Sequence, residues 1–322
     1  MFATKRVCET SAFLFIISIS SGAVFAQSPS AKIYERGNQR CVESNGVPNH
    51  EIGQFPNSGN PNRFRAQQLK FCFDKLPKKK ANPTRGTPNV GIALNGIVIR
   101  PGTADWYDAT TRRGFSRNRA SGWNLEGMGS AESLGMDKNN AHVDNRGLYH
   151  YHGKPVGLLK INKSTLVGYA ADGFEIHYVG KDAKPSYVLK SGMRPTAPGG
   201  AYDGRFVEDW KYAKNSGSLD ECNGGTIDGK FVYIATDSYP FYPRCHWGNV
   251  SQDFKRRGPR NGNRRDRRAG GGPLVGAAAD LGVSVSELRD AVGPPPPNVE
   301  QAAKRLGIPA AKIRRALRNN RP

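Results

Sequence analysis

The sequence lacks the motifs of several common enzyme classes. It contains no Gly-x-Ser-x-Gly string for a hydrolase nucleophile and no glycine-rich loop for binding phosphate. It has no Cys-x-x-Cys pair, which argues against a thiolate metal site. Beyond residue 26, no segment is long and apolar enough to cross a bilayer. Any activity must therefore depend on residues outside these familiar motifs.

Residues 1–26 have the pattern of a secretory signal. Lys5 and Arg6 give a positively charged start, and an apolar run follows over residues 11–26. Small residues at the end of this run are suited to cleavage before Gln27. The run is short for a membrane anchor, and no basic stop-transfer segment follows it. We therefore expect an exported protein, periplasmic or secreted, with no transmembrane segment after cleavage.

Cysteine is scarce, and its distribution predicts disulfides. Of five cysteines, Cys8 would leave with the signal. The other four form an even set in an oxidising compartment, which favours two disulfide bonds. Three pairings are formally open. Bonds from Cys41 to Cys72 and from Cys222 to Cys245 close the shortest loops, and we expect these two.

Acidic residues are also few, with 27 Asp and Glu against 48 Lys and Arg and a formal net charge of +21. The positive charge is concentrated in residues 75–80 and, more densely, in residues 255–268. In a cytosolic protein such runs would suggest a nucleic-acid partner, but export argues against one. We expect the basic linker to bind an anionic lipid or polysaccharide. The alternative is a solvated linker without a partner.

Composition divides the exported chain into four segments. Residues 27–65 are rich in Asn, Pro and Gly, and we expect little regular structure there. Residues 66–249 contain short β-branched and aromatic runs between turn residues, which predicts one β-sandwich-like, disulfide-bonded domain. Residues 250–272 form a linker of Arg, Asn and Gly, and residues 273–322 have helical composition. The predicted fold class is mainly β, followed by a small all-α module.

The helical segment contains a tandem repeat. Residues 277–283 recur 25 positions later as residues 302–308. Each copy predicts a short helix that ends at a glycine, followed by a second short helix. This unit resembles half of a DNA-binding helix-turn-helix, but export favours a packing or docking module. The side chains expected inside it are Leu281, Leu288, Leu306 and Ile313.

Residues 147–153, GLYHYHG, form the most specific string in the chain. Successive side chains of a strand point to opposite faces, so His150 and His152 should share one face. Tyr149 and Tyr151 should then lie on the other. Two imidazoles spaced in this way can ligate one metal ion, and neutral imidazole suits both zinc and copper.

His142 precedes this string across a predicted turn. A three-residue loop over residues 145–147, with Gly147 left-handed, would place His142 directly opposite His150. A two-residue loop would instead turn His142 toward the tyrosines. Both registers are open, and a glycine at the third loop position favours the first. That register places three histidines on one face of the hairpin.

The same string resembles the signature of the YHYH family. Further strings of that family follow in order at residues 166–174, 219–224 and 239–245, and the resemblance covers roughly residues 88–248. It implies an exported bacterial protein but little about activity. Relatives often carry a second Tyr-His-Tyr-His-like string after an Asp-Glu-Cys-Asn-Gly segment. Here that place reads Phe231-Val232-Tyr233-Ile234, with apolar residues at both histidine positions.

Other residues are candidates to complete the site. His177 alternates as on a strand and is the first candidate for a fourth metal ligand, before Asp172 and Glu221. Asp220 and Glu221 directly precede Cys222 and could supply a carboxylate ligand or a general base, or could anchor a disulfide-bonded loop. Asp172 has the alternative role of a turn residue, and a lone strand histidine is more often simply hydrogen-bonded. Whether the protein is an enzyme stays open.

Overall fold

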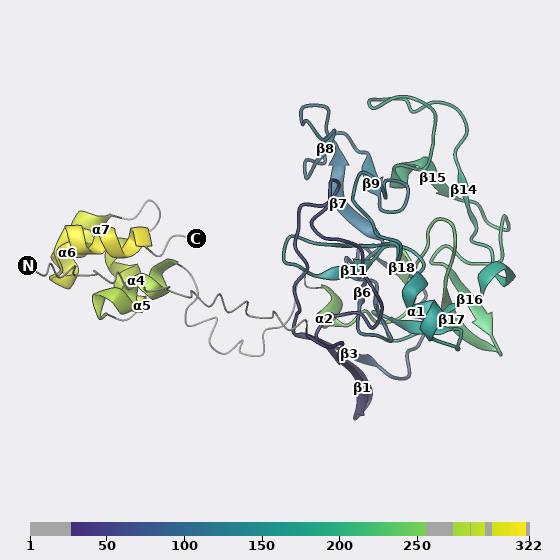
Figure 1. Cartoon of the computed structure of the whole chain (residues 1–322), viewed down its shortest axis with the longest axis horizontal. Coiled ribbons are helices and arrows are strands. Elements are labelled where there is room, and N and C mark those ends of the chain that lie inside the picture. Colours follow the sequence, from purple (N-terminus) through teal and green to yellow (C-terminus); the bar gives the residue numbers. More distant parts are fainter. Residues whose placement is uncertain (1–26, 256–272, 284, 294–297, 320–322) are drawn as a thin grey trace, which may run out of the picture.

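The computed structural model describes residues 27–255, 273–283, 285–293 and 298–319. The predicted signal and most of the predicted linker lie outside this part of the chain. Within it the fold is mainly β, with a group of helices at the C-terminal end, as predicted (Figure 1). No helix of the described residues is long and apolar enough to cross a membrane.

The centre of the β part is a mixed eight-stranded sheet (Figure 1). Its strands are the short apolar runs between turn residues, as the pattern predicted. They lie in the order β10-β11-β6-β5-β12-β13-β17-β16. Their bounds are β5 (Gly91–Ala93), β6 (Val98–Ile99), β10 (Ala141–Val143), β11 (Tyr149–Tyr151), β12 (Leu166–Ala170), β13 (Glu175–Tyr178), β16 (Gly224–Ile227) and β17 (Lys230–Ala235).

The two halves of this sheet repeat one another. Each half consists of two hairpins, and their second strands pair in parallel: β6 with β11 in the first half, and β13 with β17 in the second. β5 and β12 join the halves in antiparallel fashion, with Ile92 opposite Tyr169 at the centre. The strand registers make Tyr151 of β11 equivalent to Tyr233 of β17.

Hydrogen bonds recur at equivalent places in the two halves. Asn95, in the turn between β5 and β6, donates from Nδ2 to the Tyr151 hydroxyl at 2.9 Å. In the turn between β12 and β13, Asp172 Oδ2 accepts from the Tyr233 hydroxyl at 2.8 Å. The residues that lead into β10 and β16 share a left-handed backbone, with φ of 57° at Asn140 and 60° at Asn223. The sheet is therefore an internal duplication.

The N-terminal segment has more structure than its composition indicated. Residues 31–44, expected to be irregular, form a hairpin of β1 (Ala31–Arg36) and β2 (Gln39–Ser44), and β3 (Leu69–Asp74) extends it to three strands. Cys41 lies directly opposite Cys72 in this sheet, and the two form the first predicted disulfide. Pairing with a distant strand, which composition does not reveal, gives this segment its order.

Two apolar cores lie on the central sheet. One includes both tyrosines of β11 and Tyr233 of β17. The other lies between the central sheet and the β1–β3 sheet, which produces the sandwich-like arrangement. The start of the predicted linker belongs to this second core, because Phe254 of α2 (Gln252–Lys255) stacks on Phe71 with ring centroids 4.5 Å apart. This core therefore includes residues up to Phe254.

Smaller elements surround the central sheet. Cys245 of β18 (Cys245–His246) bonds to Cys222 as the second predicted disulfide. The remaining elements are a sheet of β8 (Phe115–Ser116), β7 (Gly102–Tyr107) and β9 (Asn124–Glu126), a pair of β14 (Tyr187–Leu189) and β15 (Trp210–Tyr212), a pair of β18 (Cys245–His246) and β4 (Thr84–Arg85), the helix α1 (Val156–Ile161), and 3-10 helices at Gly180–Asp182 and Val207–Asp209.

The C-terminal helices follow the predicted repeat. They are α4 (Pro273–Leu281), α5 (Val285–Val292), α6 (Val299–Leu306) and α7 (Ala310–Asn319). Gly282 and Gly307, at equivalent positions, follow α4 and α6 with φ of 69° and 64°. Of the four side chains expected inside, Leu281, Leu288 and Ile313 are buried and Leu306 is partly buried, all in one apolar cluster.

Removing residues 273–322 should leave the melting temperature of the β part within about 2 °C of the full-length value, a change of less than roughly 1 kcal/mol. The reason is that the apolar cluster formed by these helices and their turns contains only residues from 274 to 317. Scanning calorimetry of the two chains tests this. A fall of more than about 5 °C would show that the helices contribute to the stability of the β part.

Candidate metal centre

The β10–β11 hairpin places three histidines on one face. His142 pairs directly with His150 across the two strands, and His152 lies two residues further on the same face. Beyond the two strands, the Asp144 N–H donates to the Leu148 carbonyl at 3.0 Å, which closes a three-residue loop over residues 145–147. Gly147, the last residue of this loop, has a φ of 87°, the left-handed conformation expected there. Of the two registers that the sequence left open, the structure has the one that groups all three rings.

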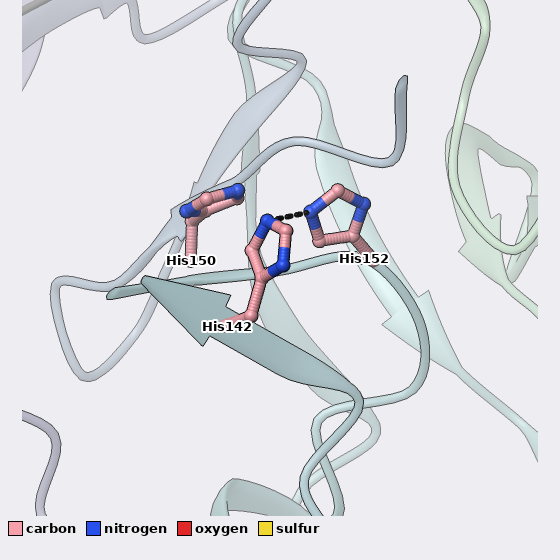
Figure 2. Close-up of side chains that lie close together, drawn as sticks. All are labelled: His142, His150 and His152. Atoms are coloured by element: carbon pink, nitrogen blue, oxygen red, sulfur yellow. Dashed lines mark hydrogen bonds between the residues drawn. The ribbon is translucent and has the colours of Figure 1, made fainter. Parts of the chain in front are cut away.

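The three rings face one another inside the protein (Figure 2). Their centroids are 4.7–4.8 Å apart in every pair. One ligating nitrogen from each ring lies within 4.8 Å of the other two. His150 and His152 are buried, and His142 is partly buried. In the described part of the chain, no other cluster of His, Cys, Asp or Glu has this geometry.

Main-chain carbonyls determine the tautomer of each ring. A carbonyl oxygen only accepts hydrogen bonds, so a ring nitrogen beside one must carry the hydrogen and donate it. In all three rings that nitrogen is Nδ1, and Nε2 of the neutral ring therefore presents a lone pair. The Nδ1 atoms of His142, His150 and His152 lie 2.8, 3.1 and 3.3 Å from the carbonyl oxygens of Leu134, Leu148 and Pro101, respectively.

The Nε2 lone pairs of two of these rings point at each other. His142 Nε2 and His152 Nε2 are 3.2 Å apart, and with both Nδ1 atoms protonated neither Nε2 has a hydrogen to donate. A cation between the rings would replace this repulsion by two coordinate bonds. Two imidazole nitrogens on one tetrahedral zinc ion, each about 2.0–2.1 Å from it, are about 3.3 Å apart. The spacing of this pair therefore fits two ligands of one ion.

Burial disfavours protonation of the three imidazole rings. Removal from water is the main cause that lowers the pKa of His142 and takes the pKa values of His150 and His152 well below the usual value. The positive charge of Arg100 lowers the pKa of all three rings further. The rings are therefore neutral near neutral pH, which is the state in which imidazole binds a metal.

The tyrosines of the signature point to the opposite face, as predicted. The Tyr149 hydroxyl donates to Asp137 Oδ2 at 2.7 Å. The Tyr151 hydroxyl accepts from Asn95 and lies 2.5 Å from His50 Nε2. Burial is the main cause that raises the pKa of both hydroxyls, which stay protonated. Their contacts hold the sheet to the segments that cover it.

The structure does not bring His177 into the cluster. His177 lies on β13, and the strands β6, β5 and β12 separate it from β11. Its ring nitrogens are 3.0 Å from Thr165 Oγ1 and 2.9 Å from Glu175 Oε2. The prediction of a fourth ligand at this position is therefore corrected, because the alternation within one strand does not specify where the strand lies in the sheet.

The three predicted carboxylates serve the second half of the sheet. Asp172 accepts from the Tyr233 hydroxyl and from a backbone N–H, both at 2.8 Å. Asp220 accepts from two backbone N–H groups of its own turn at 2.9 and 2.7 Å. Glu221 forms an ion pair with Arg85. These are the anchoring roles that the sequence left open, and none of the three belongs to the histidine cluster.

The equivalent positions in the second half carry no ligands. The duplication pairs His142 with Gly225, and it pairs the two signature histidines with Val232 and Ile234. Val232 and Ile234 are buried in a small apolar cluster. The apolar string noted at this place in the sequence is therefore the core of a hairpin built like the one that holds the histidines.

A cavity of about 550 Å³ adjoins the histidine cluster. Sequence reasoning missed its charged lining, because the residues come from separate segments and share no motif. The run of arginines between residues 112 and 119 was the available signal. The charged residues that line the cavity are Arg100, Arg113, Arg117, Arg146, Arg244, Asp105 and Asp144, and all three histidines line it too.

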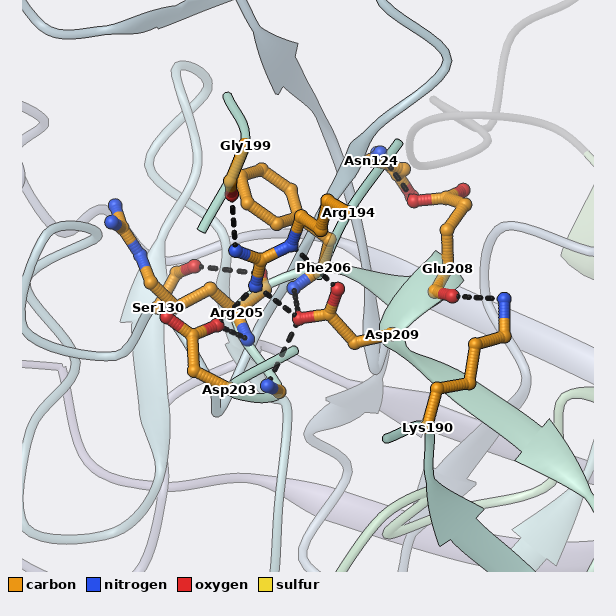
Figure 3. Close-up of polar contacts among 11 residues, drawn as sticks. Asn124, Ser130, Lys190, Arg194, Gly199, Asp203, Arg205, Phe206, Glu208 and Asp209 are labelled. Carbon is orange, nitrogen blue, oxygen red and sulfur yellow. Dashed lines mark hydrogen bonds and ion pairs between the residues drawn. The ribbon is translucent and has the colours of Figure 1, made fainter. Parts of the chain in front are cut away.

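A buried ion pair between Arg194 and Asp209 holds a segment near residue 205 in place (Figure 3). Arg194 forms two hydrogen bonds to the carboxylate of Asp209, at 2.8 and 2.7 Å, and also contacts Asp203. The side chain of Arg194 is 4% exposed and that of Asp209 is fully buried. Asp209 accepts in addition from the backbone N–H groups of Gly204 and Phe206. The pair thus fixes the chain over residues 203–209.

Polar contacts connect residues 203–209 to the lining of the cavity. The carbonyl of Arg205 accepts from the backbone N–H of Glu126 at 2.8 Å and from the Ser130 hydroxyl at 3.0 Å. The buried carboxylate of Glu126 in turn pairs with Arg244 at 2.6 Å. Arg244 lines the cavity. A chain of polar contacts therefore runs from the Arg194–Asp209 pair to the cavity lining.

Fold and site together define a disulfide-bonded, mainly β protein with a buried group of three histidines that could hold a metal ion. The chain belongs to the YHYH protein family, whose model matches residues 70–248. The matched range contains both halves of the duplicated sheet and all three histidines, and it confirms the resemblance seen in the sequence. No curated protein and no solved structure matches the chain.

Proposed function

We propose that His142, His150 and His152 hold one divalent transition metal ion, zinc or copper, in an exported protein. The observation that supports this most strongly is the convergence of three Nε2 lone pairs, with each Nδ1 bonded to a carbonyl. Imidazole suits both metals. All cysteines of the described residues are joined in disulfides and supply no thiolate.

The three-histidine set favours an accessible metal over a closed structural one. Structural zinc sites use four protein ligands, whereas catalytic sites use three and keep one position open. No fourth His, Cys, Asp or Glu from the described residues joins the cluster. The adjoining cavity lets a small molecule approach the ion. The site therefore suits binding or activation of a small molecule.

The proposed location is periplasmic or secreted. It rests on the signal-like residues 1–26 and is compatible with the two disulfides. A separate proposal concerns the basic segment at residues 255–268, for which an anionic lipid or polysaccharide is the candidate partner. That proposal rests on charge alone, because most of the segment lies outside the described residues.

Protein purified without a histidine tag should contain close to one zinc or copper ion per chain, measured by plasma mass spectrometry. Protons compete with the metal only where imidazole can be protonated, and burial lowers the pKa of all three rings. Metal should therefore be retained from about pH 8 to about pH 6.5 and lost as the pH falls further, through the lowered values. Dialysis at stepwise lower pH tests this. Metal-free protein that takes up neither ion on addition would contradict the proposal.

A further inference from the structure

We propose that the arginine-lined cavity binds a small oxyanion, a molecule that bears a carboxylate or a phosphate, and that one of its oxygens completes the coordination of the metal. This inference rests on the proposed metal site at His142, His150 and His152 and adds the class of ligand that the site receives.

The charge of the lining favours an anion. Five arginines and two aspartates line the cavity, and a metal dication would add to the positive excess. Two of the arginines are held in place by acidic partners: Arg100 pairs with Asp144 at 3.0 Å, and Arg244 pairs with Glu126 at 2.6 Å. Their positions beside the histidines are therefore fixed before a ligand arrives.

Two arginines around β8 have donors left for a ligand. The guanidinium of Arg117 makes no hydrogen bond or ion pair with any residue that the structure describes. Arg113 donates one hydrogen bond, at 3.2 Å to the carbonyl of Gly59, and lies over the ring of Phe115. A guanidinium presents five donors in a planar fork, which matches two oxygens of a carboxylate or a phosphate.

The size and construction of the cavity fit a small ligand. Its volume of about 550 Å³ is within the range of roughly 300–1,000 Å³ typical of small-molecule sites. Its walls come from stretches far apart in the sequence, including residues 59–62, 86–88, 100–105 and 142–146. Because several segments line it, the shape of this cavity is set by the fold and not by one loop.

Asp105 is the lining group that opposes an anion most directly. Its carboxylate makes no hydrogen bond within the described residues. Burial is the main cause that raises its pKa, and the charges of Arg113 and Arg117 act against this effect. Asparagine at position 105 would free both arginines from this negative charge. The Asp105→Asn variant should therefore bind an oxyanion more tightly, an effect that misfolding cannot imitate.

Protein loaded with Co²⁺, which takes the ligands of zinc and absorbs visible light, is titrated with inorganic phosphate and, separately, with citrate. At least one of them should change the cobalt spectrum. Its affinity should fall at least about tenfold in Arg117→Ala, because a charged hydrogen bond is lost. It should rise in Asp105→Asn. Arg112→Ala removes an exposed arginine outside the cavity and should match the parent.

The outcomes separate this inference from the metal site. A response to phosphate alone identifies a phosphate-bearing ligand, and a response to citrate alone identifies a carboxylate. Cobalt-loaded protein whose spectrum neither anion changes overturns the inference and leaves the metal site standing. The inference is also overturned if the anion binds the parent, Arg117→Ala and Asp105→Asn with equal affinity. Failure of the parent to take up Co²⁺ would instead overturn the proposed metal site, and the inference with it.

Discussion

Replacing His150 by alanine should lower the affinity for metal at least about 100-fold and leave the purified protein without stoichiometric metal. Changes in residues that merely orient metal ligands already cost roughly 10–100-fold, so loss of a ligand should cost no less. The ring is buried, and its Nδ1 bond to the Leu148 carbonyl leaves Nε2 as the nitrogen that can ligate a metal. Competition with a chromophoric chelator measures the affinity.

The matched control is His177→Ala, which removes a histidine from another strand of the same sheet. That ring is bonded to Thr165 and Glu175 and should contribute nothing to metal binding. Circular dichroism under non-reducing conditions checks that both variants are folded. The site assignment is wrong if His150→Ala keeps the metal content of the parent, or if His177→Ala loses it.

Replacing Arg194 by methionine should lower the free energy of unfolding by about 3–5 kcal/mol. Methionine keeps much of the side-chain volume, so the loss reports on charge more than on packing. The carboxylate of Asp209 is fully buried, and without the guanidinium it becomes an uncompensated charge in the interior. Urea denaturation with the disulfides intact measures the change.

An exposed ion pair provides the comparison. Lys138 pairs with Glu51 at 2.8 Å, but 64% and 87% of these side chains are exposed. Lys138→Ala should therefore change the free energy of unfolding far less than Arg194→Met does. If the two variants lowered the free energy of unfolding by similar amounts, burial would not make the Arg194–Asp209 pair more stabilising than an exposed pair. Residues 203–209 would then be held mainly by other contacts.

The geometry of the histidines could be predicted because it is local. The period of a strand places His150 and His152 on one face, and one glycine in a short loop favours the register that adds His142. The disulfides were predictable for a similar reason, since each bond lies within one stretch of chain. In these cases the deciding interactions connect residues close in sequence.

Features that depend on distant pairing were not predictable. His177 was grouped with the other histidines because its strand alternates, but the order of the eight strands is set by contacts across the whole domain. Residues 27–65 as a whole have a turn-rich composition, but residues 31–44 within them form two strands that pair with each other and, through β2, with β3. The cavity arginines lie between residues 100 and 244 and meet only in the folded chain. Neither composition nor the period of a strand indicates which distant residues come into contact in the folded chain.

The hairpin of Gly225, Val232 and Ile234 bears on whether the proposed metal is needed to shape the first half of the sheet. Its strands pair in the same register as β10 and β11 although it carries no metal-ligating side chain, so this register does not depend on an ion. The strand register therefore positions the histidine cluster without a metal, and the metal-free protein should already be folded. In zinc fingers, by contrast, binding and folding are a single event. Here the strand register sets the ligand positions in advance, and an ion that prefers a different coordination geometry must bind without the sheet adapting to it.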